Sequence, residues 1–437
     1  MKKEYKIKDN YLYIQYQTSK DMYEAFDEYI NKGYKITDTF NLAIELSNDI
    51  ETVLLSFHNI KNPSLDIKEE IKSLYKEYEL TYPDYDNTFL NNISTIKRNF
   101  GYVGKFEETN NFLDKEYKNI IVLILDGMGV NILNEVFPKD SFIRNHLRFI
   151  NHSIFPSTTA AATTSIKTGN SPITTGWTGW ENYIKEINKN IVLFTGRTYG
   201  TNKSTKVSYY EINPVKMFYE DMDVEGYKIE PDFNIDHKLD DVLNESLDKI
   251  KTSSKSIQYV YYTEPDTMMH IYGSNTRQTR RVCKGIDKKV KQYASKLPKD
   301  TLLIITADHG HTNVEPIELY ACKTLYNLLE RNPSNDARCL TFKVKENKHK
   351  EFENLFNKLF NGIYKLYKTK DAINEGFFGK KDDEINNRID DFLADYVAIA
   401  INKYYFIYKE KPTHIFKSHH AGITKDEMLV PVCIIGK

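Results

Sequence analysis

The sequence predicts an α/β fold, a doubly wound and mainly parallel sheet with helices on both faces. Three apolar runs rich in Ile, Val and Leu each end at an aspartate beside a turn: Asp126, Asp266 and Asp308. From Asn119 onward such runs alternate with helical patterns, which favours parallel pairing. Because the carboxyl ends of parallel strands share one edge of a sheet, we expect the three carboxylates at the edge where α/β folds build their sites.

Residues 1–95 precede this pattern and are predicted to form an N-terminal α/β accessory region. Residues 11–17 suit a strand. Ser19 is expected to cap an amphipathic helix that ends at Gly33, and residues 64–80 have the apolar spacing of a second helix. No cluster of reactive side chains occurs here. We interpret the region as an accessory layer or the surface of a homodimer, with substrate gating as the alternative.

A long segment separates Asp308 and His309 from the last histidines of the sequence. Within it, residues 339–385 are expected to form a small α/β cap-like insertion over the site, since loops at the carboxyl end of a strand often carry function. The predicted catalytic domain as a whole spans residues 96–437. The elements expected in and after the insertion are a strand at 339–345, a helix at 348–367, and strands at 395–402 and 404–409.

Charge and cysteine content exclude several classes of function. The chain has 60 Lys and Arg against 61 Asp and Glu, so there is no reason to expect binding to nucleic-acid polymers or to anionic membranes. No apolar run approaches the roughly 20 residues that span a bilayer, and the N-terminus lacks the apolar core of a signal peptide. The cysteines show no CxxC spacing and are expected to be reduced, which favours a cytoplasmic location.

Two of the three aspartates stand close to a histidine. Asp266 and His270 are four residues apart and would share one face of a helix, while His309 follows Asp308 directly and precedes a glycine. Mixed Asp and His sets are what a divalent cation of the zinc type requires. A surface pair is the usual explanation of a lone D-x-x-x-H, and a capped surface turn explains ADHG about as well. Metal binding is therefore a hypothesis at this point.

A candidate nucleophile lies in the segment FPSTTAAATTSIKTG, which places Thr159 at the start of a predicted helix. The free N–H groups and the dipole of a helix start favour an anion. A hydroxyl is a poor nucleophile near neutral pH, but coordination to a metal lowers its pKa. On this stretch alone, the simpler interpretation is that Ser157, Thr158 and Thr159 cap the helix.

Five motifs in order resemble the alkaline phosphatase superfamily, and within it the type I phosphodiesterase/nucleotide pyrophosphatase family. They are ILDGMG, FPSTTAAATTSIKTG, TEPDTMMHIYG, TADHGHT and HHAGITKDEMLVP, and the resemblance covers about residues 96–437. It implies two divalent metal ions, expected to be zinc with manganese as the alternative. The implied ligands of one ion are Asp126, Thr159, Asp308 and His309, and those of the other are Asp266, His270 and His420.

The resemblance also implies the reaction, the metal-dependent hydrolysis of a phosphoric ester. Thr159 would attack phosphorus in line as the alkoxide, and two ions would clamp the attacking and departing oxygens. Water would then hydrolyse the phosphothreonine intermediate from the opposite face, with net retention at phosphorus. Thr158 is the competing nucleophile, disfavoured because it falls one place early in the motif. His420 is preferred to His419 because HAG occupies the place of the family's HGG.

One position departs from the family pattern. Nucleotide pyrophosphatases have an asparagine three places after the nucleophile, where it helps to bind the phosphoryl oxygen, and here that place is Ala162. Asn170 or Asn182 could take over its role. No arginine nearby stands out as the clamp of a phosphomonoesterase, and the sulfatase signature C-x-P-x-R is missing, so a sulfatase is not expected.

The leading expectation is a hydrolase of small-molecule phosphodiesters or nucleotide-like esters. A phosphomonoesterase acting at the same site is the alternative, and a mutase is disfavoured because the mutases of this superfamily have serine in place of Thr159. A metal-bound binding module without turnover is the alternative from a different class. For Trp177 and Trp180 we favour core packing or a rigid turn over an aromatic rim that stacks a base.

Overall fold

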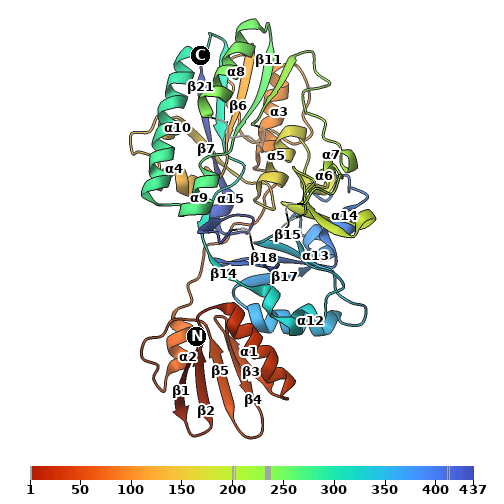
Figure 1. Ribbon diagram of the computed structural model, residues 1–437. Coiled ribbons are helices and arrows are strands. Elements are labelled where there is room, and N and C mark those ends of the chain that lie inside the picture. The colour runs from red at the N-terminus through yellow and green to blue at the C-terminus, as the bar shows by residue number, and fades with distance from the viewer. Residues whose placement is uncertain (1, 199–200, 202, 232–237, 411, 413) are drawn as a thin grey trace.

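Three larger β-sheets, arranged along the long axis of the molecule, organise the chain (Figure 1). The computed structural model describes residues 2–198, 201, 203–231, 238–410, 412 and 414–437. The central sheet lies at one end, the N-terminal sheet lies at the other, and a second six-stranded sheet lies between them.

The central sheet confirms the predicted doubly wound, mainly parallel architecture. Four neighbouring strands run parallel to one another, and the C-terminal strand joins them in the antiparallel direction. The order across the sheet is β10 (Glu225–Ile229), β11 (Ser256–Tyr262), β6 (Asn119–Leu125), β12 (Thr301–Thr306), β21 (Leu429–Gly436) and β7 (Leu147–His152).

Helices cover both faces of the central sheet because its inner strands are apolar on both sides. In β6 the even-numbered residues from Ile120 to Ile124 pack with α3 and α5, whereas the odd-numbered residues from Ile121 to Leu125 pack with α4, α8 and α10. These helices are α3 (Phe89–Asn99), α5 (Thr159–Thr168), α4 (Val130–Glu135), α8 (Leu239–Thr252) and α10 (Arg277–Lys296).

The second sheet is antiparallel and contains the predicted strands at 339–345 and 395–402. Its order is β17 (Tyr364–Lys368), β18 (Tyr396–Ala400), β16 (Cys339–Phe342), β15 (Ser334–Asp336), β8 (Glu181–Ile184) and β9 (Lys189–Val192). The helices of this region are α12 (His349–Phe360), α13 (Thr369–Asn374) and α14 (Ile389–Leu393). The predicted helix at 348–367 is too long, because its last residues pair with β18 as strand β17.

The N-terminal sheet has the order β1 (Lys3–Lys8), β2 (Tyr11–Gln15), β5 (Thr52–Ser56), β4 (Ala43–Ser47) and β3 (Lys35–Phe40). Its helices are α1 (Ser19–Asn31) and α2 (Ile67–Ser73). Met22, Tyr23 and Phe26 of α1 share one apolar cluster with Phe356 and Phe360 of α12, so this region packs against the second sheet's helix layer.

Two predicted details of the N-terminal region are wrong. Thr18, not Ser19, caps α1, since its hydroxyl accepts a hydrogen bond from the Asp21 N–H at 3.1 Å. The predicted helix at 64–80 ends at Ser73. Beyond it the chain is extended, with Thr81 N–H donating to Ile423 O at 2.8 Å, so tertiary pairing overrides the local helical spacing.

The remaining short elements connect the sheets and surround the edge of the central sheet. They are the helices α6 (Pro172–Thr175), α7 (Tyr209–Ile212), α9 (Asp266–Tyr272), α11 (Lys323–Tyr326) and α15 (Lys425–Met428), the strand pairs β13 (Thr312–Asn313) with β20 (Ser418–His419) and β14 (Glu315–Ile317) with β19 (Tyr404–Phe406), and the 3-10 turns η1 (Arg144–His146), η2 (Lys185–Ile187) and η3 (Leu319–Ala321). Among the described residues, no helix combines the length and the apolar character needed to cross a bilayer.

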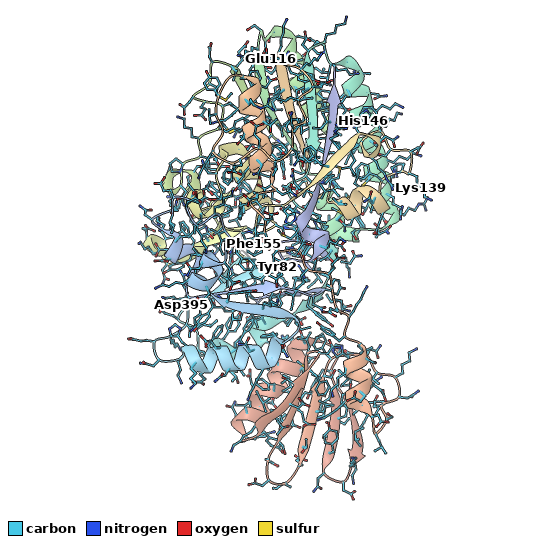
Figure 2. All side chains as sticks on the ribbon, turned by 180° about the vertical axis from the view of Figure 1, so that it is seen from behind. Tyr82, Glu116, Lys139, His146, Phe155 and Asp395 are labelled. Carbon is cyan, nitrogen blue, oxygen red and sulfur yellow. The ribbon has the colours of Figure 1, made fainter. Side chains whose placement is uncertain are left out.

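Aromatic packing joins the central part to the second sheet. Phe155 is fully buried, and its ring lies 5.2 Å from that of Phe377 and 5.5 Å from that of Phe378. The ring of Tyr82 also meets Phe377, at 6.0 Å. Figure 2 shows Phe155 and Tyr82 at the junction of these two parts, seen from behind.

A buried ion pair crosses the same junction. Arg338, just before β16, contacts Glu427 of α15 through two hydrogen bonds of 2.6 and 2.7 Å, and both side chains are fully buried. The third guanidinium nitrogen, Nη1, donates to Asn402 O and Tyr404 O, while Glu427 accepts from the Gly422 and Thr424 N–H groups. The pair therefore ties the second sheet to the loop that follows His420.

Replacing Glu427 by leucine tests this connection. We expect Glu427→Leu to lower the free energy of unfolding by about 3–5 kcal/mol, because the buried guanidinium of Arg338 loses its counter-ion. Urea denaturation measures the change. In the control Glu79→Leu, the exposed pair with Lys425 is lost, and a change below about 1 kcal/mol is expected. Equal losses of unfolding free energy in the two variants would show that the buried pair of Arg338 and Glu427 does not stabilise the junction.

Candidate metal centre

The three aspartates predicted to share a sheet edge do so. Asp126 directly follows β6, Asp308 lies two residues after β12, and Asp266 begins α9 just beyond β11. Because β11, β6 and β12 are parallel neighbours, their carboxyl ends open at the same edge. The side chains of all three aspartates are buried there.

The first group of potential ligands consists of Asp126, Asp308 and His309, whose donor atoms lie within 4.8 Å of one another. His309 Nε2 is 3.3 Å from Asp126 Oδ1, 3.6 Å from Asp308 Oδ2 and 3.3 Å from the Thr159 hydroxyl. The predicted nucleophile is therefore beside this group, at the first residue of α5. Thr158 instead donates to Asp336 Oδ2 at 2.9 Å.

Each carboxylate of this group has one oxygen with protein donors and one without. Asp126 Oδ1 and Asp308 Oδ2 are buried and have no hydrogen-bond partner. Burial and the neighbouring carboxylate of Asp308 raise the pKa of Asp126 well above its ordinary value, although Tyr261 donates a hydrogen bond to Oδ2. Burial likewise raises the pKa of Asp308. Buried acceptor oxygens without donors fit a bound cation, which would satisfy them directly.

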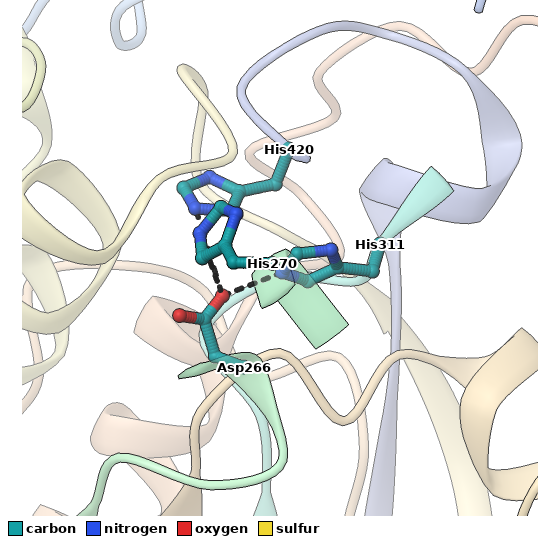
Figure 3. A group of neighbouring side chains, drawn as sticks. All are labelled: Asp266, His270, His311 and His420. Carbon is teal, nitrogen blue, oxygen red and sulfur yellow. Dashed lines mark hydrogen bonds and ion pairs between the residues drawn. The ribbon is translucent and has the colours of Figure 1, made fainter. Parts of the chain in front are cut away.

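The second group consists of Asp266, His270, His311 and His420 (Figure 3). Asp266 Oδ1 is 2.5 Å from His311 Nε2, 3.4 Å from His270 Nε2 and 3.6 Å from His420 Nε2. The two groups are adjacent, because the rings of His309 and His420 stack with centroids 3.8 Å apart.

Backbone carbonyls orient the histidine rings. The Nδ1 atoms of His270, His309 and His420 lie 2.8–3.1 Å from the carbonyl oxygens of Ser418, Gly310 and Ser157 respectively. A carbonyl can only accept, so each Nδ1 carries the proton and each Nε2 presents a lone pair to the site. This is the tautomer that a metal ligand requires.

His311 was not predicted as a site residue. Its Nδ1 lies 2.7 Å from Ser418 Oγ, and its Nε2 lies 2.5 Å from Asp266 Oδ1, both within hydrogen-bonding distance. Burial lowers the pKa of His311 to about 4, although the adjacent Asp266 carboxylate opposes this shift. The sequence did contain a signal for His311. In the segment TADHGHT, His309 and His311 are two residues apart, so in an extended chain both side chains point to the same side.

The structure brings together every residue of the predicted ligand set. His419 is also buried, but it is not part of the group, and its Nδ1 accepts from the His420 N–H at 2.8 Å. Burial and the neighbouring His309 lower the pKa of His420. Burial opposes ionisation of Asp266, but His270 and His311 outweigh it and lower the pKa of that carboxyl.

A cavity of about 280 Å³ opens onto the second group and onto Thr159. Thr159, Asp266, His270 and His420 line it on the metal side, and Trp180, Tyr408 and Phe416 supply aromatic surface. Trp177, in contrast, is fully buried and its ring is 5.0 Å from that of Tyr209. The predicted core role thus holds for Trp177, whereas Trp180 reaches the cavity.

The sheet, its covering helices and the Asp/His edge define an alkaline-phosphatase-like class of phosphoester hydrolase. A family model described as type I phosphodiesterase/nucleotide pyrophosphatase matches residues 120–423. The chain belongs to this family, as its motifs predicted. A search of curated protein sequences finds no significant match.

Solved structures show the same fold at low sequence identity. Murine ectonucleotide pyrophosphatase/phosphodiesterase 5, as an inactive variant in complex with AMP, has a TM-score of 0.53 and 16% identity, covering 72% of this chain and 87% of that one. The human protein of the same name has a TM-score of 0.52 and 14% identity, and the match covers 72% of this chain and 87% of that one. Phosphonoacetate hydrolase from Sinorhizobium meliloti 1021, in complex with phosphonoformate, has a TM-score of 0.52 and 13% identity. The match covers 73% of this chain and 90% of that one.

Loading metal-free protein with zinc at pH 7 is expected to release protons. The pKa of Asp126 is raised well above its ordinary value, which shifts its deprotonation toward neutral pH, and a cation binds only the deprotonated form. Zinc affinity should therefore rise with pH. Calorimetry in buffers of different ionisation enthalpy measures the released protons. An observed binding enthalpy that is the same in all buffers would show that Asp126 is already ionised.

Proposed function

We propose that the protein hydrolyses small-molecule phosphodiesters or nucleotide-like esters, using Thr159 as the nucleophile and two divalent ions, preferably zinc. The observation that carries the proposal is the position of Thr159. It lies at the start of α5, 3.3 Å from His309 of the first Asp/His group, and it lines one cavity with residues of the second. Asp126, Asp308 and His309 with Thr159 would hold one ion, and Asp266, His270 and His420, joined by His311, would hold the other.

The two ions would supply positive charge to lower the pKa of the Thr159 hydroxyl and to stabilise the oxygens of the reacting phosphoryl group. Thr159 Oγ then forms a bond to phosphorus while the ester oxygen departs. Water next attacks phosphorus from the opposite side, and the Thr159–phosphorus bond breaks. Two inversions give net retention. The N-terminus of α5 adds a favourable field for the anionic group, because no side chain caps it.

The cavity supports a diester as the substrate. A monoester carries an additional negative charge that an arginine clamp commonly neutralises, and among the described residues that line the cavity there is no lysine or arginine. The aromatic surface of Trp180 and Tyr408 suits an aryl or base-containing leaving group. A phosphomonoesterase is the alternative outcome of the test below.

We also propose that the protein works in the cytoplasm. The four cysteines are unpaired and buried, which suits a reducing compartment. Fractionation of the native host cells tests this proposal.

Substitution of the two neighbouring threonines tests the mechanism. We expect Thr159→Ala to reduce kcat/KM for a nitrophenyl nucleotide diester by about a thousandfold or more, because it removes the nucleophile, while metal analysis still finds bound zinc. The matched control Thr158→Ala loses only the bond to Asp336 and should keep most of the activity. A nitrophenyl phosphomonoester is assayed in parallel.

The outcomes separate the candidates. Preference for the diester, lost in Thr159→Ala and restored to chelated wild type by zinc, supports the proposal. Preference for the monoester reassigns the protein to the phosphatases. If Thr158→Ala lost activity and Thr159→Ala did not, Thr158 would be the nucleophile. Zinc binding without turnover of either ester would leave the binding module as the better description.

A further inference from the structure

One buried amide in the cavity has no protein partner. Asn335, the middle residue of β15, is fully buried, and neither its Oδ1 nor its Nδ2 makes a hydrogen bond. Its backbone φ is 89°, a left-handed value that residues other than glycine rarely adopt. Desolvated polar atoms without partners and a strained backbone both cost free energy, and such costs are concentrated at functional sites.

The position of this amide relates it to the reaction. Asn335 lines the same cavity as Thr159, Asp266 and His420. Its neighbour Asp336 accepts the hydrogen bond from Thr158, the N-cap of α5. Asn335 therefore lines the cavity together with Thr159, and the residue that follows it contacts the N-cap of α5.

Gly179 makes room for the amide. A Cβ atom built on Gly179 would fall 1.3 Å from Asn335 Oδ1. Gly179 has no left-handed φ, so the requirement for glycine comes from the space that the amide occupies and not from the backbone.

The other amides considered for this role are engaged elsewhere. Asn182 donates to Tyr209 OH at 2.7 Å and accepts from Thr178, while Asn170 accepts from Lys105. Neither is among the residues that line the cavity. Ala162 in α5 offers only a methyl group. Of the described cavity residues, Asn335 is the one with a fully buried and unpartnered amide.

We propose that the Asn335 amide donates a hydrogen bond to a non-bridging oxygen of the phosphoryl group during attack by Thr159. This inference rests on the proposed function. A neutral donor at this point positions the phosphoryl group and stabilises its oxygen without the extra charge that a dianionic monoester would need. It also replaces, from strand β15, the donor that Ala162 of helix α5 lacks.

The first experiment measures binding, so it does not depend on turnover. Inorganic phosphate is titrated into zinc-loaded protein by calorimetry, for wild type, Asn335→Gly and Gly179→Ala. The first variant removes the amide, and glycine tolerates the φ of residue 335. The second variant keeps Asn335, but the added methyl group at residue 179 displaces its amide. Both variants should bind phosphate about 10- to 100-fold more weakly, with unchanged zinc content. The control Gly285→Ala lies in α10 with no atom within 4 Å of the added Cβ and should bind as wild type does.

The second experiment uses the separate diastereomers of a phosphorothioate diester. Wild type should discriminate between them, because sulfur in place of the bonded oxygen is a poor acceptor, and Asn335→Gly should lose most of this discrimination. Wild-type phosphate affinity in both variants would overturn the inference, as would unchanged discrimination. If no ester is turned over at all, the proposed function fails while the phosphate titration still decides the role of Asn335.

Discussion

The burial of three carboxylates at one edge of the central sheet is the constraint on which the rest of the site depends. Asp126, Asp266 and Asp308 are brought together because their strands are parallel neighbours. Ionised carboxylates removed from water are costly unless they are compensated. The histidines around Asp266 lower the pKa of that carboxyl, whereas the pKa of Asp126 stays raised because protein donors do not compensate its burial. The buried carboxylate oxygens of Asp126 and Asp308 that lack a donor are the ones a bound cation would satisfy.

The second sheet supplies what the first sheet lacks. It supplies Asn335 and Asp336 to the lining of the cavity, and through Arg338 it anchors Glu427 and the loop after His420. His420, at the start of that loop, is far in sequence from Asp266, yet its Nε2 lies 3.6 Å from the Asp266 carboxylate. The packing of Phe155 on Phe377 and Phe378 keeps the two sheets together, so the geometry of the site depends on the junction as much as on the central sheet.

Local patterns predicted the elements that carry the site. The strands before Asp126 and Asp308 are long apolar runs, and Thr159 begins a helix of small residues, so short-range periodicity was sufficient there. It failed at residues 64–80 and at the end of the predicted helix 348–367, where pairing with distant strands outweighs local spacing. The unexpected site residues, His311 and Asn335, acquire their significance from neighbours more than 40 residues away, Asp266 and Gly179.

The sequence by itself determined the fold class, the family and the order of the motifs, because these depend on apolar periodicity and on residue types at short spacing. Only the tertiary structure decided which hydroxyl faces the Asp/His groups, which histidine joins Asp266 and which amide is left without a partner. Those properties depend on where distant segments converge and on which polar atoms their packing leaves unsatisfied. Thr158 and Thr159 are adjacent in the chain, but packing turns one toward Asp336 and the other toward His309.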